Sequence, residues 1–218
     1  MSAPSEIQAL ANERPWLFEL LYAFNYCPAD YVHPTRRPAT ASPGSEVLWS
    51  QLRARPALSE LLLRELALHD RPCVDVRCVQ LPLALFDSAR LAGLAMALGA
   101  VVLAPRIRAS IARDAVLAWK QRLTPRAYDF AMQAAPLLPL AGLLPQDPND
   151  ACAIEIGYDW IAASLDDAPH ELRQRALLKL PADARRGVAD ANAARQVVPR
   201  IHATLEPRWC SSFAPIRH

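Results

Sequence analysis

Apolar residues recur at helical spacing along most of the chain. The first clear case is a helix that starts at Pro15, a residue suited to a first turn, and stops at the pair Cys27 and Pro28. Its apolar face would carry Trp16, Leu17, Leu20, Leu21 and Phe24. The pattern therefore predicts an amphipathic helix that packs against a core and ends abruptly.

Prolines and small polar residues punctuate the rest of the chain into similar segments. The predicted helices are 45–52, 57–68, 88–99, 105–123, 125–135, 148–165, 169–180 and 182–206. In the longest periodic run, 105–123, one face would hold Ile107, Ile111, Ala115 and Trp119. Arginines and a lysine would occupy its other faces, as in a helix half exposed to water.

Only residues 73–79 (CVDVRCV) alternate as a strand does, and a single strand has nothing to pair with. An extended connector or a short helix explains this segment equally well. We therefore expect an all-α protein, a compact bundle of about eight to ten short-to-medium helices with proline-punctuated connections. We expect one domain over 1–218, with a division into two lobes best placed near 140–150 (GLLPQDPND lies there), and the clearest loop at 34–45.

Composition narrows the class of protein. Hydrophobic residues make up 52% of the 218 residues and charged residues 21%, which suits a folded core rather than disorder. The 24 basic and 22 acidic residues nearly balance, so no nucleic-acid footprint is present, and only 6 glycines argue against glycine-cradled phosphate sites. The uncharged run 91–105 is shorter than the roughly 20 residues that span a bilayer and predicts a buried core helix.

The amino-terminal sequence MSAPSEIQAL has neither a basic nor an apolar signal-peptide region. The five cysteines are irregularly spaced and odd in number, as expected of reduced thiols. Both observations favour a cytoplasmic protein.

The segment FNYCPADYVHP, residues 24–34, has the densest group of side chains that could take part in catalysis or metal binding. One interpretation is a cysteine-dependent hydrolase in which Cys27 is the nucleophile, His33 the base and Asp30 the group that orients it. The other is a structural elbow of Cys27, Pro28, Tyr31 and His33, with the thiol packed as a small hydrophobe and the rings bonded to backbone groups of the turn. We favour the elbow, because a thiol before proline at the end of an apolar helix is usually packed.

Two groups of residues resemble metal ligands. Cys73, Asp75 and Cys78, with His69 nearby, could contribute to a zinc site, but the spacing is wrong and no second pair follows. The acidic stretch at 147–150 suggests calcium but has no glycine at the turn position. We therefore expect no metal, no cofactor and no catalytic site.

Arginines are the remaining candidates for function. Arg36 and Arg37 lie in the long loop, and Arg106, Arg108 and Arg113 lie in the 105–123 run. If they bind a partner, an acidic protein surface is the expected one. They could equally form a solvated face.

The stretch Cys27-Pro28-Ala29-Asp30-Tyr31-Val32-His33 resembles the amino-terminal signature of the SctK family, which includes YscK and PscK, from bacterial type III secretion. More loosely, 81–111 resembles the family's central Leu-Pro-Leu segment and paired helices, and 177–181 (LLKLP) a later Leu-Pro landmark. Two features depart from the family pattern. The loop at 34–45 is longer than expected, and the arginine-rich carboxyl-terminal part resembles the family only in its general character, without a matching motif.

This resemblance implies a non-catalytic cytoplasmic adaptor of the injectisome sorting platform, docked at the cytoplasmic face of the inner membrane and needed for protein secretion. Family members connect the cytoplasmic domain of the ring protein SctD to the pod protein SctQ, and through SctQ to SctL and the ATPase SctN. No nucleic acid and no membrane insertion are implied. A cysteine-dependent hydrolase, or a helical chaperone for a secreted substrate, are the alternatives.

Overall fold

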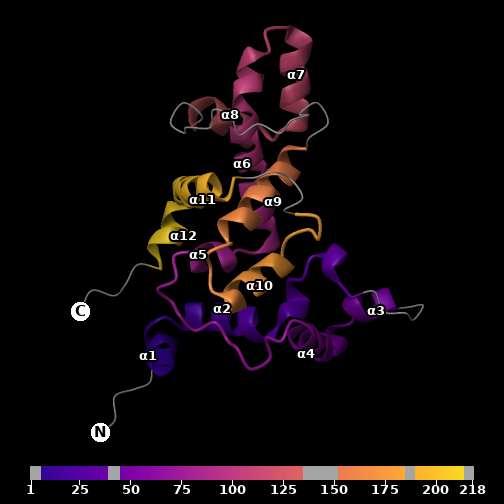
Figure 1. Cartoon of the computed structure of the whole chain (residues 1–218), viewed down its shortest axis with the longest axis vertical. Coiled ribbons are helices and arrows are strands. Elements are labelled where there is room, and N and C mark those ends of the chain that lie inside the picture. The colour runs from indigo at the N-terminus through magenta and orange to yellow at the C-terminus, as the bar shows by residue number, and fades with distance from the viewer. Residues whose placement is uncertain (1–5, 39–44, 135–151, 185–189, 214–218) are drawn as a thin grey trace. The chain divides into compact units, whose positions relative to one another are not determined.

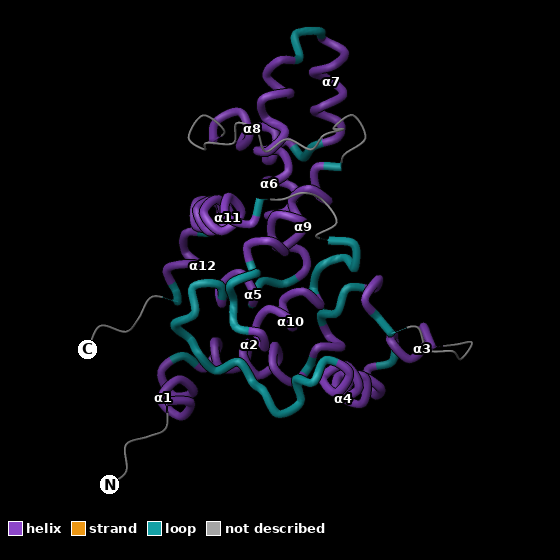
Figure 2. Tube along the Cα trace, viewed as in Figure 1, coloured by secondary structure: helices purple, strands orange, loops and turns teal. Residues whose placement is uncertain are grey.

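The structure, a computed structural model, describes residues 6–38, 45–134, 152–184 and 190–213. These residues form twelve α-helices and three 3₁₀ helices, with no strand among them (Figures 1 and 2). The all-α class is confirmed, with more and shorter helices than the eight to ten expected. Residues 73–79 form an irregular connector with turns rather than a strand.

The chain divides into two compact units. Unit 1 comprises Met1–Asp87 and Ala168–Ala182, and unit 2 comprises Ser88–Asp167 and Asp183–His218. The boundaries therefore follow Asp87, Asp167 and Ala182, while the division predicted near 140–150 lies outside the described residues. Each unit is built from two separate stretches of the chain.

Unit 1 consists of short helices, several of which have proline in the first turn. Proline fits there because the first N–H groups of a helix have no partner inside it. The elements are α1 (Glu6–Glu13), α2 (Pro15–Tyr26), η1 (Pro28–Asp30), η2 (Pro34–Arg36), α3 (Ser45–Ser50), η3 (Leu52–Ala54), α4 (Arg55–Glu65), α5 (Leu81–Ala84) and α10 (His170–Leu178). The predicted 34–45 loop thus begins with η2, and its residues 39–44 lie outside the described part.

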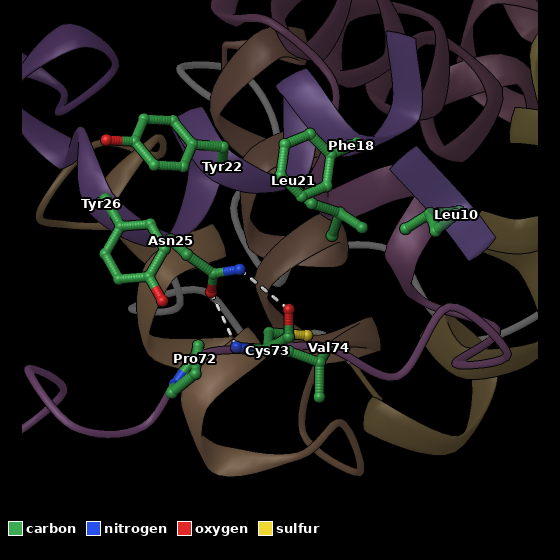
Figure 3. Close-up of a pocket in the computed structure, with 9 residues that line it drawn as sticks. All are labelled: Leu10, Phe18, Leu21, Tyr22, Asn25, Tyr26, Pro72, Cys73 and Val74. Atoms are coloured by element: carbon green, nitrogen blue, oxygen red, sulfur yellow. Dashed lines mark hydrogen bonds between the residues drawn. The ribbon is translucent and has the colours of Figure 1, made fainter. Parts of the chain in front are cut away.

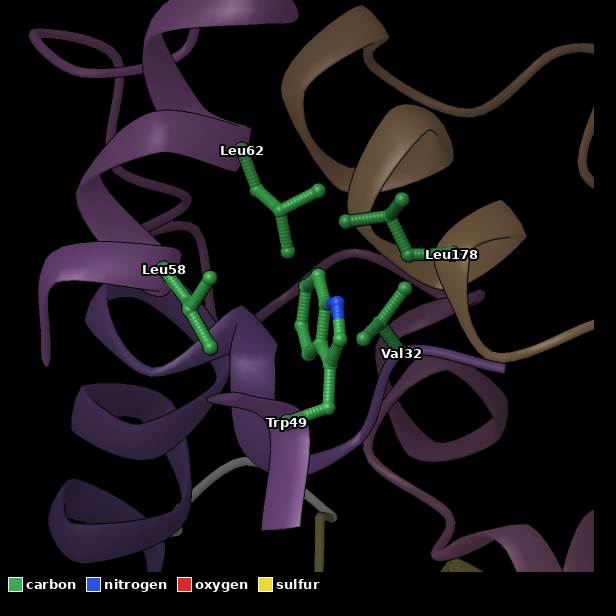
Figure 4. Packing of buried hydrophobic residues seen from close by; sticks show 5 residues of the cluster. All are labelled: Val32, Trp49, Leu58, Leu62 and Leu178. Carbon is green, nitrogen blue, oxygen red and sulfur yellow. The ribbon is translucent and has the colours of Figure 1, made fainter. Parts of the chain in front are cut away.

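A hydrophobic cluster joins four segments of unit 1. Figure 4 shows the indole of Trp49, from α3, surrounded by Val32 of the elbow, Leu58 and Leu62 of α4, and Leu178 of α10. All five side chains are buried, and each contributes about 1.5–3 kcal/mol to folding. Helix α10, distant in sequence, is therefore part of the same core as α3 and α4.

Unit 2 is organised around one long helix. Its elements are α6 (Ser88–Ala109), α7 (Arg113–Arg122), α8 (Pro125–Ala134), α9 (Ala153–Ser164), α11 (Ala191–Leu205) and α12 (Pro207–Ser211). Helix α6 packs against α8, α9 and α11, and its residues from Leu94 to Ile107 are mostly buried. Among the described helices, α6 alone is long and apolar enough to cross a membrane, but most of it is buried inside the protein, as in a core helix.

Helices α6 and α9 approach so closely that two glycines are required at their crossing. A Cβ atom on Gly99 would overlap the backbone of Ala153, and one on Gly157 would overlap the backbone of Ala95. Ala95 and Gly99 lie four residues apart in α6, as Ala153 and Gly157 do in α9. Because Gly99 faces Ala153 and Gly157 faces Ala95, the two helices run antiparallel here. Backbone therefore packs on backbone at this point.

The helix predicted for 105–123 is wrong. Helix α6 continues through Pro105 to Ala109, the chain turns, and α7 starts at Arg113. Proline removes one helical hydrogen bond, but burial of Ile107 below it favours another helical turn. As a result Ile107 is buried, whereas Ile111, predicted on the same face, lies at the turn and is 95% exposed.

Candidate functional site

The elbow after α2 is built from its own backbone. The N–H of Cys27 donates to the carbonyl of Ala23 (2.9 Å) as the last helical bond, and the chain then leaves the helical conformation. Pro28 has no N–H to continue the helix. Instead its carbonyl accepts from the N–H groups of Tyr31 (3.2 Å) and Val32 (2.9 Å), which closes a 3₁₀ turn.

Tyr31 ties this turn back to α2. Its hydroxyl donates to the carbonyl of Phe24 at 2.6 Å, and the two rings stack with centroids 5.9 Å apart. The carbonyl of Phe24 lies in the last turn of α2, where acceptors have no helical donor. Burial raises the pKa of Tyr31, so the hydroxyl stays a donor at physiological pH.

His33 and Thr35 tie the turn to the carboxyl-terminal end of α10. The N–H of His33 donates to the carbonyl of Leu178 (2.7 Å), and its Nδ1 accepts from the N–H of Thr35 (3.3 Å), which caps η2. Thr35 Oγ1 lies 2.9 Å from Nδ1 and accepts from the N–H of Ala182 at 2.8 Å. The imidazole is therefore engaged in holding the turn.

A buried lysine lies under the elbow. Lys179 is 6% exposed, and its Nζ donates to the carbonyls of Ala84 (2.6 Å) and Phe86 (2.9 Å) at the end of α5. The same Nζ lies 4.8 Å from the ring centre of Tyr31 and 5.0 Å from that of Phe24. Burial lowers the pKa of Lys179 to about 7, while Asp87 acts in the opposite direction. One side chain thus joins α5, α10 and the elbow.

A second buried cation, Arg175, lies one turn earlier in α10 and also bonds backbone carbonyls of other segments. The guanidinium of Arg175 donates to the carbonyls of Leu68 (3.0 Å), Arg71 (2.9 Å) and Glu171 (3.1 Å), and its Nε lies 3.4 Å from that of Asn25. Its donors are matched to carbonyls of three segments, so the buried charge is well hydrogen-bonded.

The Asn25 side chain pairs with one residue in both directions. Its Nδ2 donates to the carbonyl of Cys73 (2.9 Å), and its Oδ1 accepts from the N–H of Cys73 (2.7 Å). The dashed lines in Figure 3 mark these two bonds. The connector around residue 73 is therefore fixed to α2 by a side chain, as a neighbouring strand would fix it.

Cys27 does not have the surroundings of a nucleophile. Burial, and secondarily the Asp30 carboxylate, raise the pKa of its thiol, whereas a nucleophilic cysteine needs a lowered one. Asp30 pairs with Arg55 at 2.9 Å rather than orienting His33. The arrangement provides packing and a turn.

The predicted zinc candidates are likewise engaged elsewhere. Burial raises the pKa of Cys73 to about 11, Cys78 Sγ donates to Gln80 Oε1 (3.1 Å), and His69 Nδ1 lies 2.9 Å from Asp70 Oδ1. Within the described residues, no group of three or more histidine, cysteine or acidic side chains could hold a metal ion. The 147–150 stretch lies outside them.

The two loop arginines make contacts within unit 1. Arg36 donates from Nε to the carbonyl of Leu180 (2.7 Å) and from Nη2 to that of Pro181 (3.0 Å). Arg37 lies 3.5 Å from the carboxylate of Glu46 and stacks 5.2 Å over the ring of Trp49. Both contribute to the fold, and a role in partner binding stays a prediction.

The three arginines near the end of α6 differ from one another. Arg108 donates to the carbonyl of Met132 (3.1 Å), a favourable place for a cation near the carboxyl-terminal end of α8. Arg106 is half-buried and Arg113 is exposed on α7. The structure thus separates residues that the sequence placed on one helix.

Unit 1 also has an apolar groove of about 250 Å³. Figure 3 shows the side chains that line it, which come from α1, α2 and the connector after α4: Leu10, Phe18, Leu21, Tyr22, Asn25, Tyr26, Pro72, Cys73 and Val74. The rings of Tyr22 and Tyr26 pack together with centroids 5.2 Å apart, and both are exposed. A groove of this kind suits an apolar side chain rather than a charged substrate.

The family model for YOP proteins translocation protein K (YscK) matches residues 20–205. The chain belongs to the YscK family. The match runs from the middle of α2 to the end of α11, so it includes the elbow, α7 and the buried cations of α10. The predicted family is therefore confirmed.

A solved structure has the same fold. It is the cytoplasmic domain of the T3SS sorting platform protein PscK from P. aeruginosa, with a TM-score of 0.51, 22% identity, and coverage of 84% of this chain and 92% of that chain. At 22% identity, this similarity shows that the two chains share a fold and shows nothing further. A comparison with curated proteins gives no match.

The buried polar residues of this YscK-family fold were not predicted from the sequence. Asn25, Arg175 and Lys179 hold distant segments together, yet they were not among the candidates. A signal was present for Lys179, which sits between leucines in the LLKLP landmark. A lone cation within an apolar helical end can indicate a buried hydrogen-bonding role.

Proposed function

We propose that this chain is a cytoplasmic component of the type III secretion sorting platform. It acts as a non-catalytic adaptor that links the cytoplasmic domain of the ring protein SctD to the pod protein SctQ, and indirectly to SctL and SctN. The observation that carries the proposal is the YscK family match over residues 20–205. The shared fold with a PscK domain supports it.

The chemistry of unit 1 supports an adaptor rather than an enzyme. None of the possible catalytic residues is placed for catalysis: Cys27 is half-buried with a raised pKa, Asp30 forms an ion pair, and His33 caps a turn. The buried cations hold backbone carbonyls instead of facing a substrate. A rigid body of this kind presents surfaces in fixed positions, which an adaptor requires.

The burial of α6 supports a cytoplasmic protein that docks at the inner membrane through other proteins. The long apolar helix α6 is used as the core of unit 2, where it packs against α8, α9 and α11. Its burial leaves that face unavailable to lipid.

A pulldown from bacterial cytosol with the tagged full-length chain tests this proposal. We expect SctQ among the eluted proteins, and SctD when membranes are solubilised. Recovery of a secreted substrate in place of both would support a chaperone and contradict the adaptor.

A thiol assay tests the hydrolase alternative. Iodoacetamide near neutral pH should leave Cys27 of the folded protein largely unmodified, because its pKa is raised. Rapid modification of Cys27, with loss of a measurable hydrolytic activity, would overturn the non-catalytic assignment.

A further inference from the structure

Helix α7 is the least buried long helix of unit 2. None of its ten residues is buried, and the structure describes the helix in full. Its inner side is half-buried and consists of Ala115, Val116 and Trp119, with Trp119 Nε1 donating to Ser110 Oγ at 3.0 Å. The helix is thus attached along one side and exposed along the other.

The exposed side has an apolar centre within a ring of polar groups. Leu117 is 45% exposed and lies one helical turn from Arg113 on one side and from Lys120 on the other. Ile111, 95% exposed, adds a second apolar side chain at the turn before α7. An anchor surrounded by a charged rim is typical of a protein interface.

The charge of this region differs from that of the whole chain. Residues 105–134 carry six cations and two carboxylates, although the chain as a whole has 24 cations and 22 acidic residues. Some of the six cations are used internally: Arg108 binds a carbonyl of α8, and Arg122 stacks 5.3 Å from the ring of Trp119. Arg113 is exposed, and Lys120 is exposed while its Nζ lies 5.4 Å from the Tyr128 ring centre.

We propose that Ile111, Arg113, Leu117 and Lys120, the α7 surface, form the docking site for an acidic protein segment. The segment would place carboxylates opposite Arg113 and Lys120 and an apolar side chain against Leu117 and Ile111. This proposal rests on the proposed adaptor function, because the acidic segment would belong to SctQ or to the cytoplasmic domain of SctD. The excess of positive charge selects the acidic partner.

A lipid surface fits these residues less well. An interfacial helix needs a broad apolar face rich in large residues, whereas the exposed side of α7 has Leu117 alone among Asp114, Gln121 and two cations. The carboxylate of Asp114 beside Leu117 would be repelled by anionic headgroups. A protein segment can avoid Asp114 and still contact its neighbours.

Charge reversal on the full-length chain tests the docking site. The variant Arg113→Glu/Lys120→Glu is compared with Arg200→Glu/Arg208→Glu, which changes the net charge equally at exposed positions of α11 and α12. Binding to purified SctQ and to the cytoplasmic domain of SctD is measured by titration at low and physiological salt, with anionic vesicles as a third probe. Circular dichroism establishes that both variants remain folded.

We expect the α7 variant to lose affinity for one of the two proteins by about tenfold or more, with a smaller loss at higher salt, while the control variant binds as the wild type does. Leu117→Ser should weaken the same partner without changing the salt dependence. Unchanged binding of both proteins by the α7 variant, or binding of wild-type chain to vesicles through these residues, would overturn the docking site and leave the adaptor function standing. Failure of the wild type to bind either protein would instead count against the adaptor function itself.

Discussion

The Nζ of Lys179 lies 4.8 Å from the centre of the Tyr31 ring, so the elbow after α2 and the end of α10 share one buried cation. The Tyr31 hydroxyl bonds the carbonyl of Phe24, while Lys179 Nζ bonds two carbonyls at the end of α5. Phe24 and Tyr31, two aromatic residues of the conspicuous 24–34 segment, thus pack against a buried lysine. Within the amino-terminal signature, Tyr31 bonds to the end of α2 and His33 bonds to the end of α10.

Removing the Tyr31 hydroxyl should destabilise unit 1. Tyr31→Phe leaves the Phe24 carbonyl without this donor, and we expect a loss of about 1–2 kcal/mol in the free energy of unfolding. Tyr22→Phe is the control, because Tyr22 is 56% exposed on α2, and it should change stability by less than about 0.5 kcal/mol. Urea denaturation gives both values, and equal effects of the two variants would contradict the role of Tyr31.

The buried ammonium predicts a pH dependence near neutrality. The pKa of Lys179 is lowered from 10.5 to about 7 by burial, so above pH 7 the unfolded chain binds this proton more readily than the folded one. Stability should therefore rise with pH between 7 and 8.5, by about 1–2 kcal/mol from this group.

Lys179→Met isolates this contribution, because methionine is apolar and of similar length. We expect the variant to be less stable overall, since two carbonyls lose their donor, but also to lose the rise between pH 7 and 8.5. Parallel stability curves for wild type and variant would contradict the assignment to Lys179.

The crossing of α6 and α9 predicts a difference between glycines. Gly99→Ala or Gly157→Ala would push a methyl group into the backbone of the facing helix, and we expect a loss of about 1–3 kcal/mol or more. Gly93→Ala, in the same α6 helix but with no atom near its Cβ position, should be neutral or stabilise by up to about 1 kcal/mol. Thermal unfolding of the three variants checks the order, and a destabilised Gly93→Ala with a neutral Gly157→Ala would exclude the close crossing.

The class of fold could be predicted from the sequence because helical periodicity and proline positions are local signals. The starts of α2 and α8 at Pro15 and Pro125 were predicted, and Thr124 Oγ1 accepts from the N–H of Ala127 as a helix cap should. At Pro105 a helix start was predicted, but α6 continues through this residue, because burial of Ile107 outweighs one lost hydrogen bond.

The buried cations could not be predicted because their partners are distant in sequence. Arg175 meets the carbonyls of Leu68 and Arg71 only after α10 returns to unit 1, and nothing near residue 175 encodes that return. Arginine and lysine are also rarely buried, so composition assigns them to the surface. The hydrogen bonds of Arg36 to the carbonyl of Leu180, after α10, and of Arg108 to that of Met132, near the end of α8, could not be predicted for the same reason.

Unit 2 should be sensitive to acid through one histidine. Burial lowers the pKa of His202, in α11, from 6.5 to about 4, so between these values the unfolded chain takes up a proton that the folded chain refuses. Stability should fall as pH drops from 6.5 to 4, by up to about 3 kcal/mol from this group. Denaturation of wild type and His202→Asn across this range should show a shallower decline in the variant, and identical declines would exclude His202 as the source.

The proposed adaptor would join two proteins through its surfaces and would need no thiol chemistry. The most direct measurement immobilises the cytoplasmic domain of SctD on a sensor and adds SctQ with and without the full-length chain, as wild type and as Cys27→Ser. We expect SctQ to be retained only when the chain is present, and equally well with either form. Retention of SctQ without the chain, or loss of bridging in Cys27→Ser with an unchanged fold, would contradict it.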